Sequence, residues 1–475
     1  MVQKQQTFSK ARVEVKHPYL VLLGLFLGTF NGLFGETSLN IALPQLRAFF
    51  HISAGIAQWL VIGYMLMIGI ILPFSSLLMK CFSIRQLTLF ALGSSIIGSL
   101  ISGFAPDFGL LLAGRVIQGL GTGMILPMTF SVILEIFPPK RIGSAMGVSS
   151  LVVMFAPVIG PTLSGLILGA LSWRWIFFFF VIILMIAMIF TAIFMVNPYK
   201  LSHPKVDVIS CLTSILGFGG IVLGVSLASE FGFKGPIIGV LIIGIIAMIL
   251  YTKRQLQMEN PVLNIKALMV PKFRTAAILV MVDFSVTLSA MYLLPQYLQN
   301  GLTIPVALAG MILLPGGLIN VLFSYLSGRF YDQFGAKHLV RIGFFTSMIS
   351  TALLLLTSSG SSVAYIILCH ILLMIGIPLV MAPAQSSGLN ALPANLARDG
   401  STIINTLQQI IGAMSTAVAT WLLSVGQTSY FSGGGTREAE AFVKGSKYGF
   451  CFALVLSVIG FLLAFRVKET KAEKP

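Results

Sequence analysis

Apolar stretches about twenty residues long, separated by short polar segments, run through the whole sequence. A bilayer core roughly 30 Å thick is crossed by roughly 20 helical residues. In lipid, such segments must be helices, because only a helix satisfies its own backbone polar groups. The pattern therefore predicts an all-α polytopic membrane protein. Fourteen spans are expected, over residues 19–43, 57–79, 86–104, 109–133, 143–170, 175–196, 207–229, 236–252, 275–299, 305–327, 338–357, 362–384, 401–424 and 447–466.

Composition excludes two other classes of protein. Hydrophobic residues make up 57% of the chain and charged residues only 9%, whereas soluble domains carry roughly 25% charged residues. The net charge of +16 would suit a nucleic-acid-binding protein, but the basic residues are spread between apolar stretches instead of forming one stripe. The lipid bilayer is the expected partner, and nucleic acid is not.

Neither a cleaved signal peptide nor a metal centre is predicted. The first apolar stretch, 19–43, is longer than a signal-peptide core and is interpreted as an uncleaved span. Four cysteines lie far apart in or beside apolar segments, without metal-ligand spacing: Cys81, Cys211, Cys369 and Cys451. No metal, cofactor or disulfide framework is expected.

Lys and Arg predict the orientation of the chain, because they concentrate in cytoplasmic loops. With both termini placed in the cytoplasm, most of the 30 basic residues fall on the cytoplasmic side, and Arg115 falls within a span. Those on the outer side are few: Arg47, Arg174, Lys234, Arg437, Lys444 and Lys447. An even number of spans in the cell membrane is therefore expected.

An internal echo indicates a duplicated bundle. The segment GRFYDQFGAK at 328–337 follows the tenth span, and a weaker copy, LMKCFSIR at 78–85, follows the second. Two six-span bundles flanking a two-span insert would place the copies at matching positions. The expected organisation is a tail at 1–18, an N-terminal bundle at 19–200, an insert at 201–256, a linker at 257–274, a C-terminal bundle at 275–466 and a tail at 467–475.

The stronger copy has residues suited to a conformational joint. Gly328 and Gly335 would let two helices meet closely. Asp332 can accept from a neighbouring helix N-terminus, and Lys337 can anchor the interface. Two connections between spans are long: Lys253 to Arg274 is expected along the membrane surface, and Gly426 to Lys447 is expected to be a mobile external loop with room for a helical turn.

Several short motifs, in order and on the expected spans, carry a family resemblance. They are RVIQGLGTG at 115–123, GPTLSG at 160–165, SWRWIF at 172–177 and LLPQYLQ at 293–299. With them the chain resembles the fourteen-span drug:proton antiporters of the major facilitator superfamily. Gly160, Pro161 and Gly165 match the antiporter motif, with Ser164 in place of a glycine. The resemblance implies the major facilitator fold and the export of lipophilic drugs.

Two departures accompany the resemblance. The stretch GETSLNIALP at 35–44 has Gly35 where many relatives have Asp, with Glu36 next to it. This variant resembles a Gram-positive branch that includes lincosamide exporters. In the first cytoplasmic turn, Lys80 stands where the family has Asp.

Ionisable residues deep in a membrane are functional candidates because they are costly to bury. Glu36 and Arg115 are expected roughly 10 Å and roughly 9 Å from the outer surface, and can pair. Asp283 is expected roughly 13 Å from the inner surface. An antiporter can use them if a proton and a cationic substrate compete for one carboxyl. A fixed Glu36–Arg115 brace and an interhelical bond of Asp283 remain open alternatives.

Other polar and aromatic residues within the spans are candidates to line a central cavity. For each, helix–helix packing is an open alternative, and His370 is a candidate proton relay or a packing histidine. The candidates are Asn31, Phe34, Gln58, Tyr64, Gln118, Phe155, Phe284, Tyr292, Gln296, His370 and Gln408.

The function predicted from these residues is proton-coupled antiport of lipophilic, and in part cationic, small molecules by a monomer. The alternative within the same fold is export of an endogenous lipid or metabolite. An enzyme is not expected, since no Ser/His/acid or metal set occurs and the segment HPKVD at 203–207 lacks acyltransferase spacing. A receptor without transport is the remaining class.

Overall fold

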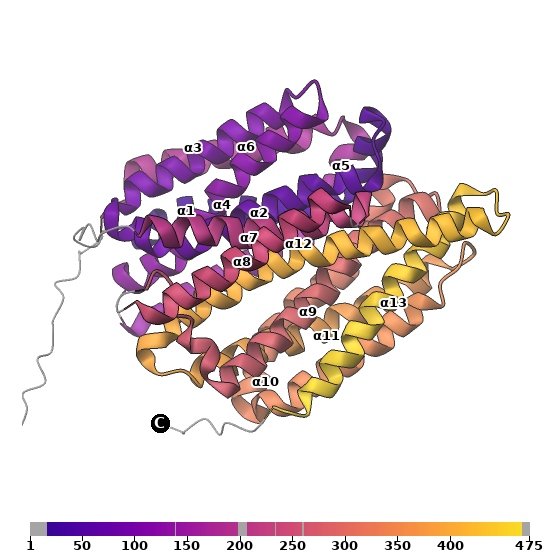
Figure 1. Ribbon diagram of the computed structural model, residues 1–475. Helices are drawn as coiled ribbons and strands as arrows, with labels where there is room; N and C mark the ends of the chain where they lie inside the picture. The colour runs from indigo at the N-terminus through magenta and orange to yellow at the C-terminus, as the bar shows by residue number, and fades with distance from the viewer. Residues whose placement is uncertain (1–16, 138, 198–206, 233, 259–260, 468–475) are drawn as a thin grey trace, which may run out of the picture.

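A computed structural model of the chain describes residues 17–137, 139–197, 207–232, 234–258 and 261–467. Within these ranges, thirteen helices are long and apolar enough to cross a membrane. The N-terminal six are α1 (Pro18–Phe50), α2 (Ala54–Cys81), α3 (Ile84–Gly103), α4 (Phe108–Ile136), α5 (Pro139–Ala170) and α6 (Arg174–Phe194). They pack on one another and form the N-terminal half, indigo to violet in Figure 1.

The C-terminal half begins after the two inserted helices. Its long helices are α9 (Pro271–Gln296), α10 (Val306–Leu355), α11 (Val363–Asn390), α12 (Ala394–Ser432) and α13 (Glu438–Ala464), with a π-helical turn η2 (Tyr297–Gly301) after α9. Helix α10 joins two of the expected spans across Gly335, whose backbone is not helical (φ 72°, ψ 177°). Counting both halves of α10 gives the fourteen spans predicted from the sequence.

The two inserted helices, α7 (Val208–Phe231) and α8 (Gly235–Gln257), pair with each other. Helix α7 also contacts α2 of the N-terminal half and α12 of the C-terminal half. In Figure 1 the pair crosses the middle of the molecule in front of these two helices. The insert therefore covers the seam along which α2 and α12 meet.

Local sequence explains where several helices begin. Ser53 accepts from the Ile56 amide at 3.1 Å and starts α2. Ser83 and Gln86 form a capping box at α3, and Asp107 accepts from Leu110 at 2.9 Å at α4. Such caps satisfy amides that have no partner within the helix.

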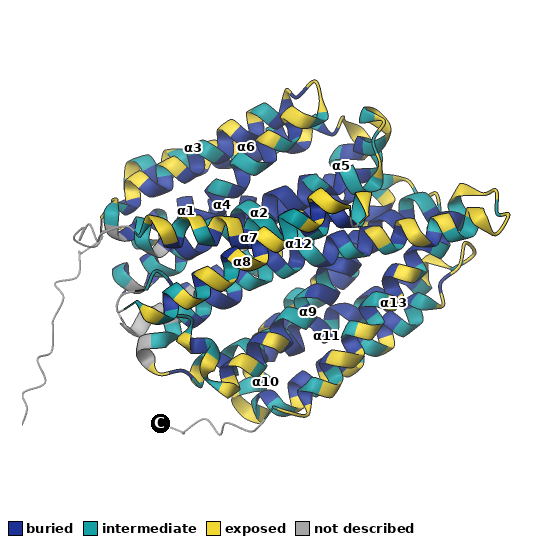
Figure 2. Cartoon of the chain, viewed as in Figure 1, coloured by how far each residue is buried: buried dark blue, intermediate teal, exposed yellow. Residues whose placement is uncertain are grey.

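The two halves meet along two helix pairs, α2 with α12 and α5 with α10. At the second pair the backbones approach closely, because a methyl group added at Gly165 would lie 2.9 Å from the Val306 carbonyl oxygen. Figure 2 shows buried residues where helices face one another and exposed residues along outward faces, as on α3 and α6. Many of the exposed residues on α6 and α8 are apolar, as expected for helices that face lipid.

The prediction of a mobile loop from Gly426 to Lys447 is wrong. Helix α12 continues to Ser432 and α13 begins at Glu438, so only a short turn joins them. The helices continue because Gly426 and Gly445 face each other, and a methyl group at Gly426 would lie 2.6 Å from the Gly445 Cα. Glu440 also accepts from Tyr430 at 2.6 Å and from Arg437 at 3.1 Å, which ties the hairpin end together.

The linker after the insert contains a short 3-10 helix, η1 (Ile265–Met269). It contacts α8, α9 and α12. Leu263 and Ala267 are buried in an apolar cluster with Phe273 and Ile404. This segment is therefore packed on the C-terminal half through its apolar side chains.

Candidate substrate cavity and buried charges

A cavity of about 540 Å³ lies between the two halves. Helices α1, α2, α4 and α5 line one wall, and α9 to α12 line the other. Its volume is in the range of pockets that hold one drug-sized molecule. Most of the lining is apolar, so a few polar groups distinguish one part of the wall from another.

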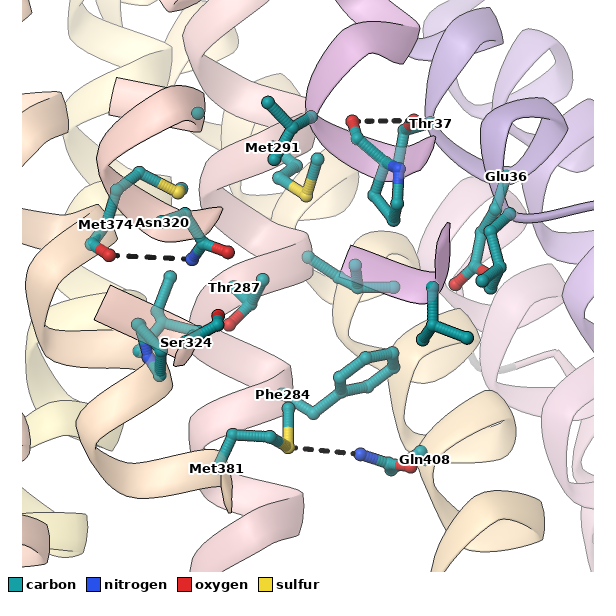
Figure 3. A pocket seen from close by; sticks show the side chains of 18 of the residues that line it. Glu36, Thr37, Phe284, Thr287, Met291, Asn320, Ser324, Met374, Met381 and Gln408 are labelled. Atoms are coloured by element: carbon teal, nitrogen blue, oxygen red, sulfur yellow. Dashed lines mark hydrogen bonds between the residues drawn. The ribbon is translucent and has the colours of Figure 1, made fainter. Parts of the chain in front are cut away.

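Glu36 is the one carboxylate among the described residues that line this cavity. It lies on α1, and only 6% of the residue is exposed. Gln409 of α12 is placed to donate to its carboxylate. In Figure 3, Glu36 lies on the N-terminal wall, across the cavity from Asn320, Ser324 and Met374. Glu36 therefore presents the cavity with an acceptor able to bind a cation.

The opposite wall carries neutral polar groups. Asn320 donates to the Met374 carbonyl oxygen at 3.5 Å, and Gln408 donates to the Met381 sulfur at 3.2 Å, as the dashed lines in Figure 3 show. His370 of α11 also lines this wall. Sequence reasoning missed Asn320 and Gln409, although a search for amides in the middle of expected spans would have found both.

Arg115 is fully buried on α4 and is bonded to backbone and amide acceptors. It donates to the Leu60 carbonyl at 3.1 Å, the Gly35 carbonyl at 2.9 Å and the Gln118 side chain at 2.7 Å. Glu36, the expected acceptor, is not among them. The structure describes both residues and has no direct bond between Glu36 and Arg115. The carbonyl of the preceding residue, Gly35, accepts from the guanidinium instead, and the Glu36 side chain lines the cavity.

The ring of Tyr64 completes the surroundings of Arg115. The guanidinium lies 3.9 Å from the ring centroid, a cation–π contact. The Tyr64 hydroxyl bonds with the Gly32 carbonyl at 2.7 Å and with Thr122 at 2.8 Å. Helices α1, α2 and α4 are thus joined at the depth of Arg115.

Asp283 is buried on α9, with 1% of the residue exposed. Both carboxylate oxygens are buried without a hydrogen-bond partner. The residue is not among those that line the cavity, although the next residue, Phe284, is. Asp283 therefore lies behind the cavity wall, inside the C-terminal half.

The structure divides the other cavity candidates into two groups. Phe284, His370 and Gln408 line the cavity. The remaining candidates lie outside its lining: Asn31, Phe34, Gln58, Tyr64, Gln118, Phe155, Tyr292 and Gln296. Most of these are buried between helices, whereas Phe155 is 39% exposed.

The segment 160–165 on α5 lies where α5 touches both α1 and α10. Gly160 faces Thr37 of α1, whose hydroxyl donates to the Pro157 carbonyl at 3.0 Å. Thr162 donates to the Gly310 carbonyl of α10 at 2.9 Å. Small residues let α5 approach both helices closely, and backbone carbonyls accept the two threonine hydroxyls. Helix α5 therefore joins the two halves.

The segment 328–337 lies within α10 at the joint between its two spans. Gly335 adopts the positive φ that glycine favours, while Gly328 is helical and a methyl group there would meet nothing within 4 Å. Asp332 is exposed, and Lys337 is half-buried. The joint therefore requires glycine at 335 for backbone conformation and not for close packing.

The cavity is closed at one end by contacts between the halves. Gln299 donates to the Ile41 carbonyl at 3.0 Å, and Arg47 lies 5.6 Å from the Phe442 ring centroid. Toward the other end the lining continues to Phe130 near the end of α4 and Gln385 near the end of α11. The contacts that close it belong to the end that the basic residues predict to be external.

Two helical halves around a central cavity, crossing a membrane many times, define a multi-pass membrane transporter. Residues 25–416 match the family model described as Major Facilitator Superfamily. The chain belongs to this superfamily, as its motifs indicated, and in bacteria such a protein lies in the cell membrane.

Relatives align over nearly the full chain. One, named lincomycin resistance protein LmrB, from Listeria monocytogenes, is 43% identical and covers 96% of this chain and 98% of its own. Another with that name, from Bacillus subtilis, is 42% identical over 95% and 96%. A multidrug export protein, EmrB from Haemophilus influenzae, is 26% identical over 85% and 80%.

Solved structures share the fold. A POT family transporter in complex with 5-aminolevulinic acid has a TM-score of 0.70 and covers 96% of this chain and 97% of its own, at 15% identity. A bacterial homologue of the lysosomal transporter Spinster has a TM-score of 0.64 at 16% identity, with 94% and 96% covered. At such low identity the likeness concerns the fold.

Proposed function

We propose that this protein exports lipophilic, cationic drugs across the cell membrane by proton-coupled antiport. The observation that carries the proposal is the central cavity with Glu36 as its carboxylate. An apolar cavity takes lipophilic molecules, and one buried anion selects those that carry a positive charge. The names of the relatives, lincomycin resistance and multidrug export, support drugs as the substrates.

Competition for Glu36 supplies the coupling. A protonated carboxyl is neutral and no longer holds a cation, whereas an ionised one does. If the protein reorients readily only with Glu36 occupied, drug exit and proton entry alternate. Exchange of one proton for one monovalent cation moves no net charge, so the proton concentration gradient drives it; a second proton, bound at Asp283, adds roughly 2.3 kcal/mol per 100 mV of membrane potential.

Asp283 and Arg115 have separate roles in this proposal. Asp283, behind the wall and without a partner, is the second protonation site. Arg115 holds α1 against α2 and α4 through its bonds to Gly35 and Leu60, and its charge favours ionised Glu36 from a distance. Its main contribution is therefore to the fold of the N-terminal half.

Ethidium uptake into inverted membrane vesicles tests the proposal. Wild type is expected to accumulate ethidium when the vesicle interior is acidic, and to lose this activity when nigericin collapses the gradient. Glu36→Gln should lower gradient-driven uptake at least about tenfold, since a neutral amide cannot exchange a proton for a cation. Asp283→Asn should lower it as well.

The outcomes separate the carboxyls. Uptake abolished by Glu36→Gln and unchanged by Asp283→Asn would place coupling on Glu36 alone. Uptake that is intact in both variants contradicts the mechanism. Absence of ethidium and lincomycin transport by correctly inserted wild type favours an endogenous lipid or metabolite as substrate.

Arg115→Ala provides a matched control for stability. Removing a buried, hydrogen-bonded charge leaves carbonyls unsatisfied and should cost about 2–4 kcal/mol. Its thermal unfolding midpoint in detergent should fall, whereas that of Glu36→Gln should remain near the wild-type value. A midpoint for Glu36→Gln as low as that for Arg115→Ala would assign both residues to one structural brace.

A further inference from the structure

His370 is a buried polar side chain whose surroundings do not satisfy it. It lies on α11, lines the cavity, and is 6% exposed. Its Nδ1 is buried without a hydrogen-bond partner. A histidine that served only to join helices would have its partner on a neighbouring helix, and the structure provides no such partner for this buried nitrogen.

The neighbouring helix is shaped to admit the ring. Gly316 of α10 lies against the imidazole, and a methyl group added there would overlap the ring atoms. The absence of a side chain at 316 thus leaves a seat for His370 within the cavity wall. The seat fixes the imidazole with Nδ1 turned toward Gly316, which leaves Nε2 as the ring nitrogen that can bond outside the seat.

Neutral hydrogen-bonding groups surround this seat. Asn320 and Ser324 of α10 line the cavity on the same wall, and Asn320 uses its amide nitrogen on Met374, one helical turn from His370. Glu36 lies on the wall across from them (Figure 3). The cavity therefore has an anionic wall and a neutral, hydrogen-bonding wall.

We propose that His370, seated against Gly316, forms a subsite with Asn320 and Ser324 that binds the hydroxyl- or amide-rich part of a substrate whose cationic amine is bound by Glu36. The proposal deepens, and rests on, the proposed drug export. It makes His370 a specificity residue: bulky cations without hydrogen-bonding groups bind through Glu36 and apolar contacts, and His370 contributes nothing to them.

Equilibrium binding to the purified full-length protein in detergent tests the subsite. Two radiolabelled probes are compared: lincomycin, which carries an amine, an amide and sugar hydroxyls, and tetraphenylphosphonium, a permanent cation without hydrogen-bonding groups. His370→Leu should raise the Kd for lincomycin roughly 3- to 10-fold, the effect of one lost neutral hydrogen bond. The Kd for tetraphenylphosphonium should stay within about twofold, which also reports correct folding.

Two further variants address a merely structural role. His370→Gln keeps a donor and an acceptor near the same place and should retain lincomycin affinity within about threefold. Gly316→Ala fills the seat and should reproduce the loss caused by His370→Leu. Glu36→Gln should weaken both probes, because both are cations.

Equal weakening of both probes by His370→Leu, or weakening of neither, overturns the subsite while leaving drug export in place. Wild type that binds tetraphenylphosphonium but not lincomycin also overturns it. Wild type that binds neither probe overturns the proposed function, and the subsite with it.

Discussion

Gly335 has a backbone conformation that other residues avoid. Its φ of 72° and ψ of 177° lie in a region that is open essentially to glycine alone. No neighbour approaches the position where a side chain would begin. The need for glycine at 335 is therefore purely conformational, and it marks the joint between the two spans of α10.

Gly335→Ala should destabilise the protein by about 1–3 kcal/mol, because alanine must adopt the strained conformation or shift the joint. Gly328→Ala is the matched control. Gly328 is helical and has open space around it, so alanine should be neutral or stabilise by up to about 1 kcal/mol. Thermal unfolding midpoints in detergent measure both. Equal effects would show that the two glycines of the segment share one role.

At the scale of elements, polar bonds fasten the two inserted helices to each other and to the linker. Arg254 at the end of α8 donates to both carboxylate oxygens of Asp207, at 2.7 and 2.8 Å. Gln255 donates to Ser210 at 2.6 Å and accepts from the Leu263 amide at 3.2 Å. The Arg254 guanidinium holds the pKa of Asp207 well below its usual range.

Asp207→Asn should lower the thermal midpoint of the protein at pH 7 and loosen the α7–α8 pair. The folded-state pKa of Asp207 is depressed, so its contribution is fully present above the unfolded pKa of about 4, declines below that value, and is lost as pH falls through the depressed folded pKa. The difference between the midpoints of wild type and variant, measured from pH 8 to pH 3, should therefore be constant at neutral pH and begin to narrow below about pH 4. A difference that does not change across this range would contradict the assignment.

At the scale of the whole molecule, the contacts between the halves gather at one end. Gln299 meets Ile41 there, and a methyl group added at Gly169 of α5 would lie 2.7 Å from the Ala307 Cβ of α10. The cavity extends toward the opposite end. With the orientation that the basic residues predict, this is a state closed to the outside, and alternating access requires these contacts to separate.

A disulfide can hold that end closed. Cysteines at Gly169 and Ala307, in a background without the four native cysteines, should oxidise spontaneously after a small shift, since disulfide Cβ atoms lie about 3.8 Å apart. Efflux should fall at least about tenfold and return with dithiothreitol. Each single cysteine variant, treated alike, should be unaffected by oxidation. Wild-type efflux by the oxidised double variant would show that this end need not open.

Some parts of the site could be predicted from the sequence and others could not. Glu36 and Arg115 stand out as charges within apolar spans, and both are buried. Which groups bond to Arg115 could not be predicted, because the rotation of α1 about its axis decides whether the Glu36 side chain or the Gly35 carbonyl meets the guanidinium. The span at 401–424 is polar at its start because Ser401, Asn405 and Gln408 face the cavity. Its sequence alone does not show this, because the helices that pack beside it decide which of its faces lines the cavity.

The amino-acid sequence is enough to show that this chain crosses a membrane many times and is built of helices, because span length and hydropathy depend on local composition and the bilayer alone. Its short motifs also indicate the superfamily. Tertiary structure decided which polar residues meet. Asn320, His370 and Gln409 lie far apart in the chain, and they line one cavity only because α10, α11 and α12 pack around it. The facing directions of packed helices depend on all their neighbours together, so local sequence cannot specify them.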